Sequence, residues 1–242
     1  MRRCLATAFG RTGAGAARAG TLVAMPWLEL ADLPFATALH PYPGGLRIGG
    51  DYDCAHFDKA VFDGADAADS RFLECAFTGV VFQGGELRRS RLTDVWLRDV
   101  RLTGTSLAET DWTDAVFLAS AAAGAEAFGA QLRRVTFHGC KLDSVNFRDA
   151  VLTDVTFEDC LLRDVDFTGA TLTSTAFPRS RLTQVTFAKM TLDRVDLRDA
   201  ELGITTDSGS LRGAIVTTAQ LVDMAYLLAD SMGIIVADAP RA

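Results

Sequence analysis

Residues 145–174 read VNFRD AVLTD VTFED CLLRD VDFTG ATLTS, six pentads in one phase. The centre of each pentad is Phe or Leu, and the residue two positions earlier is small or β-branched. The phase extends from Ala55 to Ile204, where 27 of 30 pentads have Phe, Leu or Trp at the centre. A repeat of this length is the feature that decides the fold.

A period of five fits neither regular secondary structure. On an α-helix, steps of five residues move around the axis instead of staying on one face. On a continuous strand, every second centre would face water. The pattern therefore predicts a chain that turns a corner after each pentad, with the centre and the residue two before it pointing inward. Stacked coils then bury the centres in one continuous column, as solenoids do.

The pentads resemble the motif A(D/N)LXX of the pentapeptide repeat family, as in Val145–Asp149, Ala150–Asp154 and Ala200–Ile204. The resemblance covers about 60% of the chain. It implies an all-β solenoid, a right-handed quadrilateral parallel β-helix with four pentads per coil. Thirty pentads then give about 7–8 coils, or a rod of roughly 36 Å at about 4.8 Å per coil.

One part of the repeat is weak. The patch Ser120–Phe128 has Ala at both of its centres, Ala122 and Ala127, while the phase continues on both sides. Two interpretations are open, a thinly packed coil and a ten-residue excursion from the solenoid. We expect locally loose packing at this patch.

The repeat divides the chain into four parts: 1–24, 25–54, 55–204 and 205–242. The first is rich in Ala, Gly and Arg and is predicted to be a disordered extension, with a natural start at Met25 as the alternative. Arg11 and Arg18 interrupt the apolar run that a secretion signal requires. Since the sequence also has no apolar run of about 18 residues, we expect a cytoplasmic protein without a membrane segment.

Residues 25–54 combine Trp27 and Phe35 with several leucines and four prolines. Proline prevents a long helix here. An open solenoid end would expose unpaired backbone groups. We therefore expect this part to be an N-terminal cap whose Trp and Leu side chains lie over the first coil.

The last part of the chain predicts one capping helix. Thr217 and Gln220 form a capping box at its start, and Gly233 is the expected stop. An apolar stripe follows helical spacing along it: Leu221, Met224, Ala225, Leu228 and Met232. Further apolar residues make this surface larger than one coil end needs. Family members with a C-terminal dimerisation helix imply a homodimer contact through the stripe, and the alternative is a cap alone.

Residue types that carry catalysis are present but not arranged for it. His40, His56 and His138 have no Ser or Cys partner at a motif spacing. The sequence contains no CxxC pair and no Cys/His cluster at zinc spacing. We expect no catalytic, cofactor-binding or metal-binding residues, and no enzyme. Cys140 and Cys160, one coil apart, are predicted to be reduced core thiols, although a disulfide is conceivable.

The formal net charge of −7 lies in the solenoid, because residues 53–202 carry 24 Asp and Glu against 17 Lys and Arg. Direct binding of nucleic acid is therefore not expected. When the outward residues are assigned to the four faces of 20-residue coils, one face is clearly acidic. Its carboxylates are Asp66, Asp69, Glu86, Glu109, Glu126, Asp149 and Asp166, interrupted by Arg88, Arg89, Arg148 and Lys189.

These features predict a binding protein, and the preferred function is a rigid scaffold whose acidic face binds another protein. The resemblance offers an alternative, because quinolone-resistance members of the family are acidic rods that imitate duplex DNA and bind DNA gyrase. The expected rod length is close to one turn of DNA, about 34 Å. However, a duplex carries one charge per about 1.7 Å of axis, so the net charge of −7 is about a third of the duplex value. An enzyme is the least favoured alternative.

Overall fold

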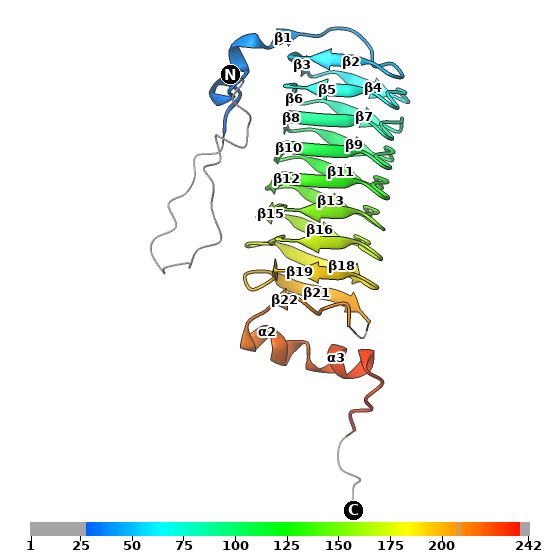
Figure 1. Ribbon diagram of the computed structural model, residues 1–242, viewed down its shortest axis with the longest axis vertical. Helices are drawn as coiled ribbons and strands as arrows, with labels where there is room; N and C mark the ends of the chain where they lie inside the picture. Colours follow the sequence, from blue (N-terminus) through cyan, green and yellow to red (C-terminus); the bar gives the residue numbers. More distant parts are fainter. Residues whose placement is uncertain (1–27, 208, 238–242) are drawn as a thin grey trace, which may run out of the picture.

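The computed structural model describes residues 28–207 and 209–237. It is a rod of stacked coils, with a short N-terminal segment against one side near one end and two helices at the other end (Figure 1). The predicted extension 1–24 and Trp27 lie outside the described residues.

Two parallel sheets form most of the wall. The larger contains β1 (His40–Pro41), β2 (Asp51–Asp53), β3 (Ala55–Asp58), β5 (Arg71–Leu73), β6 (Ala76–Thr78), β8 (Arg91–Arg98), β10 (Asp111–Leu118), β12 (Gln131–His138), β14 (Val151–Thr153), β15 (Thr156–Glu158), β17 (Thr171–Thr173) and β19 (Thr191–Asp193). The smaller contains β4 (Val61–Asp63), β7 (Val81–Gln83), β9 (Arg101–Thr103), β11 (Ala121–Ala123), β13 (Lys141–Asp143), β16 (Leu161–Arg163), β18 (Arg181–Phe187) and β21 (Glu201–Thr206). A final pair joins β20 (Val195–Asp196) to β22 (Ala214–Ile215).

The strand register confirms four pentads per coil. Residues 20 apart are paired along the repeat, as in Trp112 with Leu132 and Phe117 with Phe137, up to the last coil, where the register shifts by one and Val185 pairs with Ile204. Each coil therefore contains 20 residues, and the rod has about eight coils. The predicted β-solenoid is confirmed.

Corners form because every fifth residue has a left-handed backbone. The φ angles are 56° at Asp149, 55° at Asp154, 52° at Asp159, 51° at Asp164 and 75° at Gly169. Asp and Gly adopt this conformation more readily than most other residues. The Asp and Gly residues that recur at the ends of pentads are thus suited to the turn that they make.

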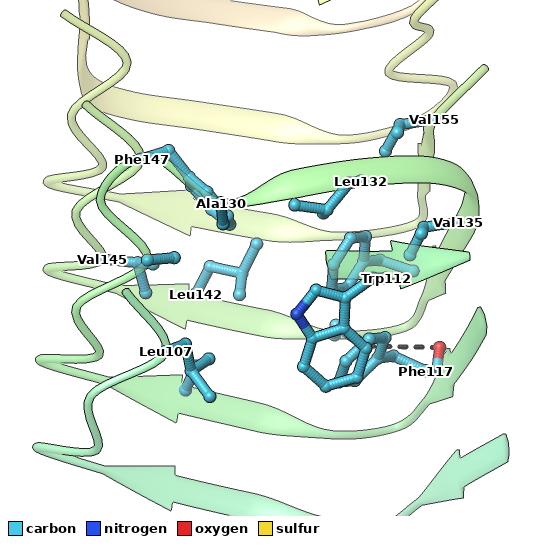
Figure 2. Packing of buried hydrophobic residues seen from close by; sticks show 14 of the residues in the cluster. Leu107, Trp112, Phe117, Ala130, Leu132, Val135, Leu142, Val145, Phe147 and Val155 are labelled. Atoms are coloured by element: carbon cyan, nitrogen blue, oxygen red, sulfur yellow. Dashed lines mark hydrogen bonds between the residues drawn. The ribbon is translucent and has the colours of Figure 1, made fainter. Parts of the chain in front are cut away.

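The predicted core column is present. The rings of Phe117, Phe137, Phe157 and Phe177 stack in sequence, with centroids 4.6, 4.8 and 5.0 Å apart. Figure 2 shows Trp112, Phe117 and Leu132 in this interior, with Val135 beside them on the wall. The column is continuous from coil to coil, so each coil is stabilised by packing against its neighbours.

The alanine patch is a thinly packed coil and not an excursion. Ala122 pairs with Leu102 in the coil before and with Leu142 in the coil after, so the chain stays in register. A cavity of about 40 Å³ lies inside this coil, bordered by Ala122, Ala127 and other small residues. The expectation of loose packing is confirmed.

Filling this cavity is expected to stabilise the protein. Ala122→Val should raise the free energy of unfolding by about 1 kcal/mol, since two methyl groups enter empty apolar space. The matched control is Ala150→Val, at a fully buried position that does not border the cavity, where overpacking should cost about 1–3 kcal/mol. Thermal unfolding of both variants checks this, and a loss of stability for Ala122→Val would contradict it.

The sequence predicts that residues 28–39 lie over the first coil, and this placement is wrong. These residues, which we call the side segment, lie against the side of the rod. The side segment contains two short 3-10 helices, η1 (Leu30–Asp32) and η2 (Ala36–Ala38). Its buried side chains Leu33 and Phe35 pack on outward residues of successive coils, not over the first coil. The residues beneath them are Ala76, Trp96, Val116 and Leu118. The Trp96 indole donates a hydrogen bond to the carbonyl of Leu28 (3.0 Å).

The N-terminal end of the rod is covered by Tyr42 and Tyr52, which follow the side segment in the sequence. Strand β1 pairs with β3 and extends the sheet. The Tyr42 ring lies 5.2 Å from that of Phe57, and Tyr52 stacks on Phe72 at 4.7 Å. The end of the column is therefore sealed by aromatic residues that the repeat pattern did not single out.

The C-terminal cap has two short helices where the sequence predicts one, α2 (Thr218–Asp223) and α3 (Ala225–Ser231). The capping box is confirmed, with the backbone amide of Gln220 donating to the Thr217 hydroxyl (3.1 Å). Gln220 Nε2 also donates to the carbonyls of Leu197 and Ala200, which ties α2 to the last coil. Gly233, at φ 72°, ends the helical segment as predicted.

Candidate functional site

The acidic residues predicted from the sequence do gather on one face. Isolated bridges connect position 66 to positions 86, 106, 126, 146, 166 and 186 in order, so Asp66, Glu86, Glu126 and Asp166 belong to one column along the rod. Asp69, Glu109 and Asp149 occupy the left-handed corner of the same face. We call this the acidic face.

Arginines neutralise part of the acidic face. Three of its seven carboxylates form ion pairs: Arg89–Asp69 (2.7 Å), Arg148–Asp166 (3.6 Å) and Arg88–Glu86 (3.7 Å). The hydrogen bond from Arg89 lowers the pKa of Asp69. A continuous array of free carboxylates, which imitation of a phosphate backbone requires, is therefore interrupted at three points.

The other four carboxylates, Asp66, Glu109, Glu126 and Asp149, make no ion pair within the described part of the chain. Asp66 accepts the backbone amide of Ala68 (3.0 Å), and Glu126 accepts the side-chain amide of Asn146 (2.6 Å). Their negative charge remains available to a partner.

The acidic face also contains Phe128, which the search for candidate residues missed. Its side chain is 43% exposed. The signal was present in the sequence, because Phe128 is one position out of phase with the buried centres.

The predicted dimer stripe is split by the structure. Met224 lies between the two helices and is buried against the core, and Leu228 packs partly on it. Leu221, Ala225 and Met232 are exposed. Met224 and Leu228 are therefore parts of the cap, and a single continuous contact stripe does not form.

A broader apolar surface takes the place of the stripe, and we call it the cap surface. It comprises the exposed residues Leu221, Val222, Tyr226, Met232, Ile234, Ile235 and Val236. Tyr226 is 74% exposed and Ile235 is 91% exposed. A hollow of about 350 Å³ opens beside α3, with Leu211 and Leu228 among its lining residues. The sequence indicated further apolar residues beside the stripe, but the contact was assigned to the stripe.

Two clusters bring together side chains of the types that bind metals. In the first, the Cys54 thiol lies 3.6 Å from an Asp53 oxygen and 3.5 Å from a Glu74 oxygen. Burial and these carboxylates raise the pKa of Cys54 to about 11, so the thiol keeps its proton and donates to them.

The second cluster is His138, Glu158 and Asp159. Arg179 binds both carboxylates, including Asp159 Oδ2 at 2.8 Å. An arginine thus holds the position that a cation would take, and the cluster is an ion-pair network.

Sequence models of known families match most of the repeat. One, described as a pentapeptide repeat region, matches residues 111–187 and 130–206, and a second, pentapeptide repeats in eight copies, matches residues 55–94. Together they cover more than half of the chain. This chain belongs to the pentapeptide repeat family.

Several solved pentapeptide repeat proteins are similar in structure. A trypsin-treated variant of QnrB1, a plasmid-mediated fluoroquinolone resistance protein, is 19% identical, with 78% of this chain and 100% of that chain covered and a TM-score of 0.43. HetL from the cyanobacterium Nostoc, involved in heterocyst differentiation regulation, is 18% identical, with 72% and 92% covered and a TM-score of 0.32. At these values the neighbours carry no argument about function. No curated protein sequence matches the chain.

Pentapeptide repeat proteins are generally structural or binding proteins. Cys54, Cys75, Cys140 and Cys160 are free. Cys140 and Cys160 are buried as predicted, and each donates to a backbone carbonyl of the coil before it. Among the described residues, no helix is long and apolar enough to cross a membrane.

Proposed function

We propose that this pentapeptide repeat protein is a rigid, non-catalytic scaffold that binds another protein and forms a homodimer through the cap surface. The observation that carries the proposal is the cap surface. Seven large apolar residues are exposed between Leu221 and Val236, whereas exposed apolar residues on the described solenoid are isolated. Contiguous patches of this kind mark interaction sites.

The geometry of the rod supports a twofold assembly. The cap surface lies at one end, and two copies can bury it against each other through the same residues, as in most homodimers. The hollow beside α3 would accept apolar side chains of the second copy. The long sides of both rods then remain free for another protein.

Charge placed on the cap surface is expected to convert a dimer to a folded monomer. Tyr226→Asp and Val222→Asp introduce a carboxylate where the side chain is exposed in the single chain, so folding should be unaffected while the desolvation cost opposes association. Light scattering measures the mass. Leu228→Asp is a poorer test, because that residue packs on the core.

Val61→Asp is the matched control, since Val61 is similarly exposed but lies on β4, in the solenoid. It should leave the mass of the dimer unchanged. A wild-type protein that is a monomer at micromolar concentration would restrict these helices to a capping role.

The scaffold function itself is tested by recovering partners from a cell lysate. Partners should persist after nuclease treatment, because the acidic rod binds proteins and not nucleic acid. Failure to recover any nuclease-resistant partner would contradict the scaffold function.

A second candidate is an acidic DNA mimic that binds DNA gyrase and protects it from quinolones. The column of Asp66, Glu86, Glu126 and Asp166 at coil spacing favours it, and the three arginine pairs oppose it. Gyrase supercoiling with and without the protein is the test. Inhibition that Asp66→Lys, Glu126→Lys and Asp149→Lys together relieve would support the mimic, and no inhibition at micromolar protein would remove it.

A further inference from the structure

Phe128 differs from the other phenylalanines of the repeat because it does not stand at the centre of its pentad. Thirteen phenylalanines lie between Ala55 and Ile204, and the other twelve are buried centres. Phe128 instead points away from the core and is 43% exposed. A single exposed apolar residue is ordinary on a protein surface, so its setting has to decide whether it has a role.

The core beneath Phe128 is underfilled. The neighbouring inward centre is Ala127, which borders the cavity of about 40 Å³. A large apolar centre at position 127 would supply the missing volume, as Leu107 and Phe147 do in the coils on either side. This pentad therefore lacks a large side chain inside and exposes one outside, and both features cost stability. Where a sequence breaks its own folding pattern without a compensating gain, a functional constraint is the expected cause.

The charges around Phe128 indicate what it would bind. Glu126 is in the acidic column of the same pentad. The amide of Glu109 donates to the carbonyl of Phe128 (2.8 Å), and the Glu109 side chain lies over the corner at Gly129. Asp149 occupies the same corner one coil further on, with its carboxylate beside Gly169. None of these carboxylates has an ion-pair partner among the described residues.

Two arginines lie beside these carboxylates, and each is paired with a different carboxylate. Arg89, in the coil before Glu109, is paired with Asp69 at 2.7 Å. Arg148, directly below Phe128 in the stack, is paired with Asp166 at 3.6 Å. The exposed ring thus shares its face of the rod with three carboxylates that make no ion pair among the described residues. This combination suits a positively charged group that has both a flat face and hydrogen-bond donors.

We propose that Phe128 is the centre of a docking surface for an arginine-containing segment of the partner protein. The guanidinium stacks on the ring, and its charge meets Glu109, Glu126 and Asp149. Aromatic and arginine side chains are both enriched at protein–protein interfaces. The inference rests on the proposed scaffold function and names the chemistry of its partner. It differs from DNA imitation, because a single ring with three carboxylates is not an array of phosphates.

A fluorine-labelled protein tests this directly. With 4-fluorophenylalanine at position 128 of the full chain, the peptide acetyl-GLRGLRG-amide should shift the ¹⁹F resonance. The same peptide with citrulline in place of arginine keeps the shape but lacks the charge, and it should bind at least about tenfold more weakly. The triple variant Glu109→Gln, Glu126→Gln and Asp149→Asn should weaken binding of the arginine peptide by a similar factor.

The control label is 4-fluorophenylalanine at Leu161, which is similarly exposed but lies on β16. Its resonance should not move. Equal binding of the two peptides, an equal shift at position 161, or no shift at position 128 with millimolar arginine peptide would each overturn the proposal.

The failure of this inference can be separated from failure of the scaffold function. If Phe128→Ala recovers the same nuclease-resistant partners as the wild type, this surface is not the docking site and the scaffold function stands. If the wild type recovers none, the scaffold function fails.

Discussion

Replacing Phe157 with Ala is expected to lower the free energy of unfolding by about 3–5 kcal/mol. The ring is fully buried and lies between Phe137 at 4.8 Å and Phe177 at 5.0 Å. Its removal opens a cavity inside a column whose walls are held by hydrogen bonds to both neighbouring coils, so collapse around the gap is limited. Chemical denaturation followed by circular dichroism measures the loss.

Phe128→Ala is the matched control, because it makes the same chemical change in the same solenoid. Phe128 is partly exposed and does not contribute to the column, so its loss should change stability by no more than about 0.5 kcal/mol. Equal losses for the two variants would mean that the stacked rings do not stabilise the rod.

Gly85→Ala is the second substitution with a large expected effect. Gly85 has φ +81°, and a Cβ added there would lie 2.5 Å from the carbonyl oxygen of Ala65 in the preceding coil. The side chain therefore adds backbone strain and also forces two coils apart. We expect a loss of about 3 kcal/mol or more.

The neighbouring glycine provides the control for this substitution. Gly84 also has a left-handed backbone, at φ +62°, but a Cβ there meets nothing within 4 Å. Gly84→Ala should cost only the strain of a left-handed alanine, about 1–2 kcal/mol. Thermal and chemical unfolding of the two variants separate the steric effect from the strain. If Gly85→Ala costs no more than Gly84→Ala, the coils relax without penalty and the close contact is unimportant.

The residues of the acidic face could be predicted, and the pairing of its carboxylates could not. Assignment to four faces correctly brought Asp66, Glu86, Glu126 and Asp166 into one column. Whether a carboxylate is free depends on side-chain conformation and on distances of a few ångströms. Arg89 reaches Asp69 in the preceding coil at 2.7 Å, and a count of charges per face cannot show this.

The helical cap illustrates a similar limit. Thr217, Gln220 and Gly233 were predicted correctly because capping is a local interaction between residues close in sequence. The break at Met224 was missed, since that side chain turns into the core of the last coil. A helical stripe read from spacing alone assumes that the helix is continuous.

The 150-residue repeat was sufficient to specify the turn after each pentad and the inward positions, because each pentad repeats the same local conformation. Four pentads per coil were implied by the family resemblance, and the 20-residue register confirms them. Contacts without periodicity required the folded molecule. The side segment reaches Trp96 across 68 residues of sequence, and only spatial proximity relates the two. The same holds for the cavity beneath Phe128, since the volume left inside a coil depends on how neighbouring side chains fill it.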